Sequence, residues 1–231
     1  MCGRFAVDIH LGVIEEVFEL GDDHDAIELS PTWNAAPGTE QVVVRRGREG
    51  ERRAARPRWG LVPHWADDPS IGNRLVNARS ESAAEKPAFR DAFARHRCLI
   101  PATGFYEWDS RSGTRDPWFY VVDQGAPFAI GGVWSRWRDE EGDVLDTFCV
   151  LTTEANALTT AVHDRMPVLV DRGEYDRWLA PDTSSDALAA IMRPFDPQRM
   201  DGWMVSRDVN KPQNDGPELI RPERPAQGRL F

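Results

Sequence analysis

The stretch CLIPATGFYEW, residues 98–108, decides the fold class of this 231-residue chain. It is dominated by apolar and aromatic side chains, a composition typical of a buried strand. Three further runs of the same kind follow closely: PWFYVV at 117–122, FAIGGVWSRW at 128–137 and TFCVLTT at 147–153. Because many strands follow one another with helices inserted between some of them, we expect a single α+β domain built on antiparallel sheet, barrel-like in form.

The remaining patterns place helices around that sheet. Apolar residues at helical spacing predict helices at 11–20, 154–163, 173–180, 184–192 and, most clearly, 80–97, where Ser80 is a candidate cap. Further strands are expected at 41–46, 166–170 and 202–206, a strand running into a loop at 56–68, and a loop at 32–40. We therefore assign residues 1–220 to one domain. We expect the Pro-rich segment 221–231 to be a flexible tail.

Composition limits the function classes. The chain has 38 acidic and 28 basic residues and a formal net charge of −10, which argues against a generally basic nucleic-acid binder but allows a local basic groove. No apolar run approaches 18 residues and no signal segment precedes the domain, so a cytoplasmic protein without membrane contact is expected. Three cysteines without a CxxC spacing argue against a disulfide framework or a zinc site. No metal or organic cofactor is indicated.

The second residue is the most unusual chemical feature. Cys2 directly follows the initiator Met1 and is small enough for that methionine to be trimmed. The mature chain would then begin with a cysteine that carries a free amine and a thiol on neighbouring carbons. That pair supports chemistry that no internal cysteine can perform.

Polar residues also stand among apolar neighbours at several strand ends. They are Asn77 and Arg79 in LVNARSES, Glu107 in GFYEW, Thr152 in FCVLTTEAN, His163 and Arg165 in AVHDRMP, and His64 and Trp65 in VPHW. Each has a structural alternative: an ion-pair partner, a hydrogen-bonded histidine, or a tryptophan that fills core. Their co-occurrence with Cys2 favours a functional site.

Eight motifs in order make the chain resemble one family. They are MCGRF, WNAAPGT, WGLVPHW, NARSE, FRDAF, RCLIPATGFYEW, LTTEAN and VHDRMPV, followed by VSRDVN near residue 206. Together they are similar to the SRAP family, the abasic-site processing proteins of the DNA damage response, whose members bond their N-terminal cysteine to the sugar aldehyde left when a base is lost. The resemblance implies that Cys2 is the nucleophile, that Met1 is removed by the protein itself, and that single-stranded DNA containing abasic sites is the partner. The sequence leaves removal of Met1 by an aminopeptidase as the alternative.

By the same resemblance, Asn77, Glu107 and His163 fall on active-site positions, and Arg79 and Arg165 fall where DNA phosphate is held. An α-amine with a pKa of roughly 7.7–8.0 is partly neutral near pH 7 and can form a Schiff base with the sugar. The thiol can then close a five-membered thiazolidine. Glu107 and His163 would move protons, and Asn77 would orient the sugar or the Cys2 backbone.

We expect a wider DNA-binding surface around these residues. Its predicted members are Arg4, Pro37, Trp65, Arg79, Trp108, Thr152 and Arg165. The arginine side chains can bind phosphate, and Trp65, Trp108 and Pro37 can pack against bases. For these last three residues, a structural role within the protein is an equal alternative.

The last five residues suggest a second partner. QGRLF resembles peptides that dock on replication sliding clamps, with Gln227 for polar contacts and Leu230 and Phe231 for an apolar pocket. Chance is the alternative for so short a pattern. We expect a monomer that acts at damaged or replicating DNA in the nucleoid.

Two other functions stay open at this stage. Glutamine amidotransferases of the N-terminal nucleophile type also begin with Met-Cys-Gly, and there the thiol attacks an amide. A non-catalytic single-strand binder would use the arginines and tryptophans alone, and would bind intact and abasic strands equally.

Overall fold

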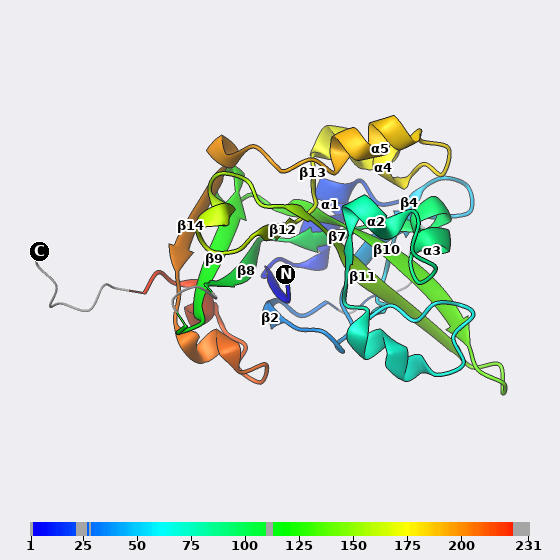
Figure 1. The fold of residues 1–231 in the computed structure, drawn as a ribbon, viewed down its shortest axis with the longest axis horizontal. Helices are drawn as coiled ribbons and strands as arrows, with labels where there is room; N and C mark the ends of the chain where they lie inside the picture. The colour runs from blue at the N-terminus through cyan, green and yellow to red at the C-terminus, as the bar shows by residue number, and fades with distance from the viewer. Residues whose placement is uncertain (1, 22–26, 28, 110–112, 224–231) are drawn as a thin grey trace, which may run out of the picture.

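Two β-sheets form the framework of the computed structural model (Figure 1), which describes residues 2–21, 27, 29–109 and 113–223. Within these residues, the smaller sheet has five antiparallel strands in the order β14-β9-β8-β1-β2. Its strands are β1 (Arg4–Val7), β2 (Thr32–Ala35), β8 (Gly104–Asp109), β9 (Asp116–Val122) and β14 (Met200–Met204).

The larger sheet is mostly antiparallel and follows the path β12-β11-β10-β7-β3-β4, with β13 beside β10 and the short β5 and β6 parallel to β11. Its strands are β3 (Val43–Arg46), β4 (Arg52–Ala55), β5 (Arg58–Trp59), β6 (Asn77–Arg79), β7 (Arg97–Ala102), β10 (Phe128–Arg138), β11 (Val144–Glu154), β12 (Arg165–Pro167) and β13 (Leu169–Val170). The α+β class built on antiparallel sheet is therefore confirmed. Both sheets end in edge strands, so the barrel-like form is not a closed barrel.

The stretch 98–108 contributes strands to both sheets. It divides at Thr103: β7 pairs with β10 and β3 in the larger sheet, and β8 pairs with β1 and β9 in the smaller one. Gly104 permits this passage, because a Cβ atom there would lie 2.0 Å from Cζ of Phe119. One buried cluster then fills the space between the sheets, with Phe5 and Phe105 from one and Ile100 from the other.

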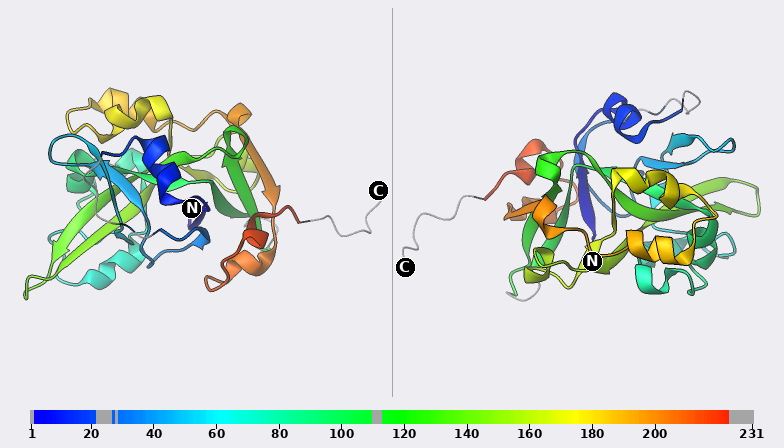
Figure 2. Two further views of the ribbon diagram at one scale, coloured as in Figure 1. Left: turned by 180° about the vertical axis from the view of Figure 1, so that it is seen from behind. Right: turned by 90° about the horizontal axis from the view of Figure 1, so that it is seen from above.

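Helices cover the ends of this framework. Their bounds are α1 (Leu11–Phe18), α2 (Ser80–Ala83), α3 (Arg90–Arg95), α4 (Tyr175–Leu179) and α5 (Ser185–Ile191). Helices α4 and α5 lie together above β13 in Figure 1, and Figure 2 shows the same pair from above. The Trp178 indole of α4 donates a 2.9 Å hydrogen bond to the carbonyl of Cys98 in β7, which ties this layer to the larger sheet. Among the described residues no helix has the length and apolar character needed to cross a bilayer.

The structure differs from several sequence predictions. The helix expected over 80–97 is two short helices, α2 and α3, because Pro87 lies between them and cannot continue a helix. Ser80 is the first helical residue rather than the cap; the cap position is Arg79 and has no side-chain capping bond. The helix expected over 154–163 is a single 3-10 turn, Thr159–Ala161.

The loop expected over 32–40 contains strand β2, because Ala35 pairs with Phe5 of β1 and so supplies a partner that propensity does not foresee. Residues 221–223 are the described part of the segment that we expected to be a flexible tail. Pro222 forms a β-bridge with Val205, and the Glu223 amide donates a 2.8 Å hydrogen bond to the Met204 carbonyl. The rest of the tail, with Gln227, Leu230 and Phe231, lies outside the described residues.

Candidate active site

Cys2 lies at the entrance to β1, the strand between β2 and β8 in the smaller sheet. Its side chain is fully buried, and its Sγ atom lies 3.7 Å from the carbonyl oxygen of Arg4. Burial raises the pKa of the Cys2 thiol well above its ordinary range, with a smaller contribution from the negative charge of Glu107. The sulfur is therefore held as a neutral thiol.

Asn77 is the direct partner of the Cys2 backbone. It begins β6, whose parallel pairing with β11 sets Asn77 opposite Val150. Its Nδ2 donates a 2.8 Å hydrogen bond to the carbonyl oxygen of Cys2. The other amide atom, Oδ1, is buried and has no hydrogen-bond partner among the described residues. Asn77 thus fixes Cys2 through one atom and keeps an acceptor available beside it.

Glu107 lies beside the same segment. Arg4 of β1 pairs with Tyr106 of β8, so the next residue of β8 falls at the level where Cys2 and Gly3 enter the sheet. The side chain of Glu107 is 1% exposed, and burial raises its pKa to about 7. A carboxyl group with such a pKa can give or take a proton near neutral pH.

His163 approaches from the turn before β12. Its Nδ1 accepts a 2.9 Å hydrogen bond from the Arg165 amide, and the Asp164 carboxylate lies 3.0 Å from the same atom. One nitrogen cannot accept an N–H bond and also offer a proton to a carboxylate. As the acceptor of the Arg165 amide, Nδ1 carries no proton, so the ring proton is assigned to Nε2. The Asp164 charge also helps to raise the pKa of Glu107, after burial, so this turn lies near the carboxyl group.

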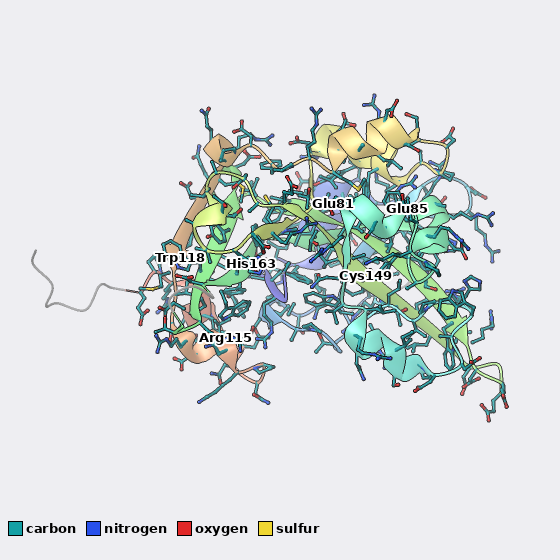
Figure 3. All side chains as sticks on the ribbon, in the orientation of Figure 1. Glu81, Glu85, Arg115, Trp118, Cys149 and His163 are labelled. Carbon is teal, nitrogen blue, oxygen red and sulfur yellow. The ribbon has the colours of Figure 1, made fainter. Side chains whose placement is uncertain are left out.

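Arg165 is held by the protein. Its guanidinium makes two hydrogen bonds to Glu81, at 2.6 and 2.9 Å, and a third to the Thr152 carbonyl at 2.5 Å. Its side chain is only 11% exposed, whereas that of Glu81 is 49% exposed. Thr152 is wholly buried, with its hydroxyl 3.4 Å from the Ala78 carbonyl, so its side chain faces the protein interior and not the DNA-facing surface we expected. In Figure 3, Glu81 and His163 lie near the middle of the molecule, while Arg115 and Trp118 lie towards its left edge.

The other predicted DNA contacts differ in exposure. Arg79 is exposed and has no ion pair or hydrogen bond from its side chain among the described residues. Trp65 is 49% exposed, and Pro37 is also exposed. The Trp65 loop is shaped by a close approach of Gly60 to Gly72, where a Cβ on Gly60 would lie 2.7 Å from the Gly72 oxygen.

Arg4 and Trp108 instead bind other parts of the chain. The Arg4 guanidinium donates to Asn34 Oδ1 at 2.7 Å and to the Val209 carbonyl at 2.8 Å, and the Trp108 indole donates to Asn210 Oδ1 at 2.6 Å. Arg4 nevertheless lines a pocket of about 500 Å³ together with Pro37, so part of it faces open space.

Two residues of the site escaped the sequence reasoning. Asn34 is 4% exposed, and besides accepting from Arg4 its Nδ2 lies 2.8–3.2 Å from the carbonyls of Val209, Lys211 and Asn214. It joins β2 to the segment that follows β14. Glu81 was missed as the partner of Arg165. Both occur inside the quoted motifs, WNAAPGT and NARSE, which was the available signal.

Comparisons with known proteins identify the family of this chain. A family model, SOS response associated peptidase (SRAP), matches residues 1–212, and the chain belongs to this family. YoqW of Bacillus subtilis, an abasic site processing protein, is 36% identical over 222 residues, which covers 95% of this chain and 99% of YoqW. YedK of Escherichia coli, with the same description, is 29% identical and covers 96% of this chain and 100% of its own.

The fold is also shared with solved structures. A Bacteroides thetaiotaomicron protein of 24% identity superposes with a TM-score of 0.84, covering 96% of this chain and 100% of its own. A Bordetella bronchiseptica protein of 28% identity superposes with a TM-score of 0.74, covering 89% of this chain and 100% of its own. The family match spans all the motifs quoted above, from MCGRF at residues 1–5 to VSRDVN at residues 205–210.

Proposed function

We propose that this protein processes abasic sites in single-stranded DNA by forming a covalent bond between the mature N-terminal Cys2 and the damaged deoxyribose. The relatives named above are described as abasic site processing proteins, and the chain belongs to their family. The observation that carries the proposal is the arrangement at Cys2: Asn77 bonds its carbonyl at 2.8 Å, and a buried carboxyl group with a pKa of about 7 stands beside it.

The reaction starts at the amine. Removal of Met1 by the protein itself exposes the Cys2 amine, which attacks C1′ of the open-chain sugar to form a carbinolamine. The hydroxyl leaves as water, and an imine remains. The Cys2 sulfur then bonds to C1′ while the thiol proton passes to nitrogen, so that a thiazolidine forms with the net loss of one water. This order fits the raised pKa of the Cys2 thiol, because a neutral thiol leaves the first attack to the amine.

Proton transfer falls to Glu107 and His163. As a carboxylate, Glu107 takes a proton from the Cys2 ammonium; as the acid, it returns one to the departing hydroxyl. His163 carries its proton on Nε2, opposite the Nδ1 that Arg165 holds, and this proton is directed away from the backbone for use in opening the sugar ring. The free Oδ1 of Asn77 accepts a hydrogen bond from the sugar or from the carbinolamine.

DNA binding uses the exposed members of the predicted surface. Arg79, which pairs with no described residue, contacts phosphate, and Trp65 and Pro37 pack against unstacked bases.

Arg165 and Thr152 have a different role. Thr152 and Glu81 orient the Arg165 guanidinium, which meets a phosphate only in competition with the Glu81 carboxylate. Arg4 and Trp108 shape the neighbouring surface through Asn34 and Asn210. The tail peptide with Gln227, Leu230 and Phe231 remains a proposed sliding-clamp ligand.

The test uses a uracil-containing single strand, with and without uracil glycosylase, on a denaturing gel. We expect a shifted band only after glycosylase treatment, and none with Cys2→Ala. Cys149→Ala, at a buried cysteine that has no part in the proposed reaction, should retain it. Intact mass should equal the protein without Met1 plus the strand minus one water. Active material that retains Met1 would contradict the proposal, as would equal binding of intact and abasic strands with no heat-stable complex.

A further inference from the structure

A second basic surface lies away from Cys2. The β3–β4 hairpin and β10 enclose a cleft of about 770 Å³. Its charged lining consists of Arg45, Arg46, Arg48, Arg53, Arg136, Glu49 and Glu51. None of the active-site residues lines this cleft, and β4, which supplies Arg53 and Ala54 to its lining, lies to the right of the N-terminus in Figure 1. The function of Cys2 therefore leaves this cleft unexplained.

The charge of the cleft is unusual for this chain. Arg45 and Arg136 share one carboxylate, Asp146, at 3.0 and 2.7 Å. Arg46 and Arg48 are exposed, and their side chains have no ion pair among the described residues. A chain of net charge −10 thus presents a local surplus of positive charge here, with two guanidinium groups available to a ligand.

Stacked rings accompany the arginines. The His96 ring stacks on Trp134 with centroids 4.6 Å apart, and the Arg45 guanidinium lies 4.4 Å from the Trp134 ring centroid. Burial and the neighbouring positive groups lower the pKa of His96, so its ring is neutral at pH 7. Aromatic rings next to arginines form the combination that binds single strands, with stacking for bases and guanidinium groups for phosphates.

The loop that carries Trp65 is tied to β10, the strand that lines the cleft through Trp134 and Arg136. The indole of Trp137 in β10 donates a 2.7 Å hydrogen bond to the carbonyl of Ala66, the neighbour of Trp65. The half-exposed Trp65 therefore lies near the strand that forms one side of the cleft. A strand that packs against Trp65 can continue from there to Trp134 and the hairpin arginines.

We propose that this cleft is a second contact for single-stranded DNA, which holds the strand on one side of the lesion bound at Cys2. The inference rests on the proposed function for the position of the lesion. Its partner is the sugar-phosphate backbone of an unpaired strand, with a base on the exposed ring of His96, which Trp134 supports from the other side.

The experiment measures anisotropy of intact, undamaged strands of about 6 and about 20 nucleotides, and of a 20-base-pair duplex, over a salt series. The variant is Arg46→Gln/Arg48→Gln, and its matched control is Arg193→Gln/Arg221→Gln, two exposed arginines outside the cleft. For the long strand we expect on the order of tenfold weaker binding at low salt and a salt slope smaller by about 1.4, since each lost phosphate contact on a single strand removes about 0.7. The short strand, the duplex and the control should change little.

Crosslinking of a short abasic strand at saturating concentration separates the two proposals. The Arg46→Gln/Arg48→Gln variant should crosslink at the wild-type rate. An unchanged salt slope for the long strand would overturn the second contact, as would an equal loss of affinity for the duplex. If neither wild type nor the variant crosslinks abasic DNA, but the variant still shows the smaller salt slope with intact strands, the proposed function is wrong and the second DNA contact is supported.

Discussion

The side-chain amide of Asn77 donates a 2.8 Å hydrogen bond to the carbonyl oxygen of Cys2, 75 residues earlier in the chain. This bond joins β6 of the larger sheet to the start of β1 in the smaller sheet, and thereby sets the direction in which the Cys2 amine leaves the backbone. The proposed nucleophile is therefore positioned by the junction of the two sheets.

Asn77→Asp tests that relationship. The substituted carboxylate keeps the size of the side chain but cannot donate, and it repels the Cys2 carbonyl. Loss of a buried hydrogen bond costs about 1–3 kcal/mol, so we expect the crosslinking rate at saturating abasic strand to fall on the order of 10- to 100-fold. Single-turnover gels measure it, and an unchanged rate in a folded variant would show that Asn77 does not orient Cys2.

Glu107 predicts a particular pH profile of the reaction. Its pKa of about 7 and that of the terminal amine, roughly 7.7–8.0, both favour the reactive form as pH rises. The wild-type rate should therefore rise steeply between pH 6 and 8, with two ionisations in the pH–rate profile. Glu107→Gln should react more slowly, and its profile should show only the ionisation of the amine. Rates across this range decide the matter; two ionisations in Glu107→Gln would remove the carboxyl group from the mechanism.

The same carboxyl group links stability to pH. Its folded pKa of about 7 is above its ordinary value of 4.5, so its contribution to stability is fully present below pH 4.5 and is lost as pH rises through 7. The loss amounts to ~3 kcal/mol as an order of magnitude. Urea denaturation at pH 4.5 and 8 should show that the free energy of unfolding of wild type declines relative to that of Glu107→Gln. If the free energies of unfolding of both proteins declined equally, a group other than Glu107 would be responsible for the pH dependence.

Glu81 should limit the affinity for DNA. Its carboxylate holds both terminal nitrogens of Arg165 and competes with phosphate for them. We expect Glu81→Gln to bind single strands severalfold more tightly at low salt, with the gain lost at high salt as screening increases. Glu85→Gln, an exposed glutamate just beyond α2, removes the same charge and serves as the control. Equal gains in both variants would indicate net charge alone.

Trp65 should contribute to strand binding without contributing to the core. It is 49% exposed, and stacking of one base on an aromatic ring is worth about 1–3 kcal/mol, so Trp65→Ala should weaken strand binding roughly 5- to 100-fold. Its melting temperature should stay close to that of wild type. Val144→Ala, at 46% exposed, is the matched control, and equal binding by both variants would exclude a base contact.

Gly104→Ala tests the passage between the sheets. The added Cβ would lie 2.0 Å from the Phe119 ring, which is itself 2% exposed and cannot move aside. Overpacking of this kind costs about 1–3 kcal/mol in the free energy of unfolding. Gly173→Ala, with no atom within 4 Å of the added carbon, should be neutral in the same denaturation series. Equal stability of both variants would mean that β8 shifts freely.

The sequence by itself determined the elements whose signals are local. The apolar runs identified β9, β10, β11 and the stretch 98–108, which the structure divides into β7 and β8, and the helical spacing at 11–20 identified α1. The proposed chemistry of a terminal aminothiol was likewise suggested by the place of Cys2 next to Met1. Local signals suffice here because strand and helix propensity depend on side chains a few residues apart.

Only the tertiary structure decided which polar groups meet. The strand β2 exists because β1 offers it a partner, and Arg165 is held because Glu81, 84 residues earlier, comes within 2.6 Å of it. Burial raises the pKa of Glu107, and Arg46 and Trp134 line one cleft. Both features depend on contacts between residues that are far apart in the sequence. Desolvation and hydrogen bonding act over a few ångströms in space, so no pattern along the chain records them.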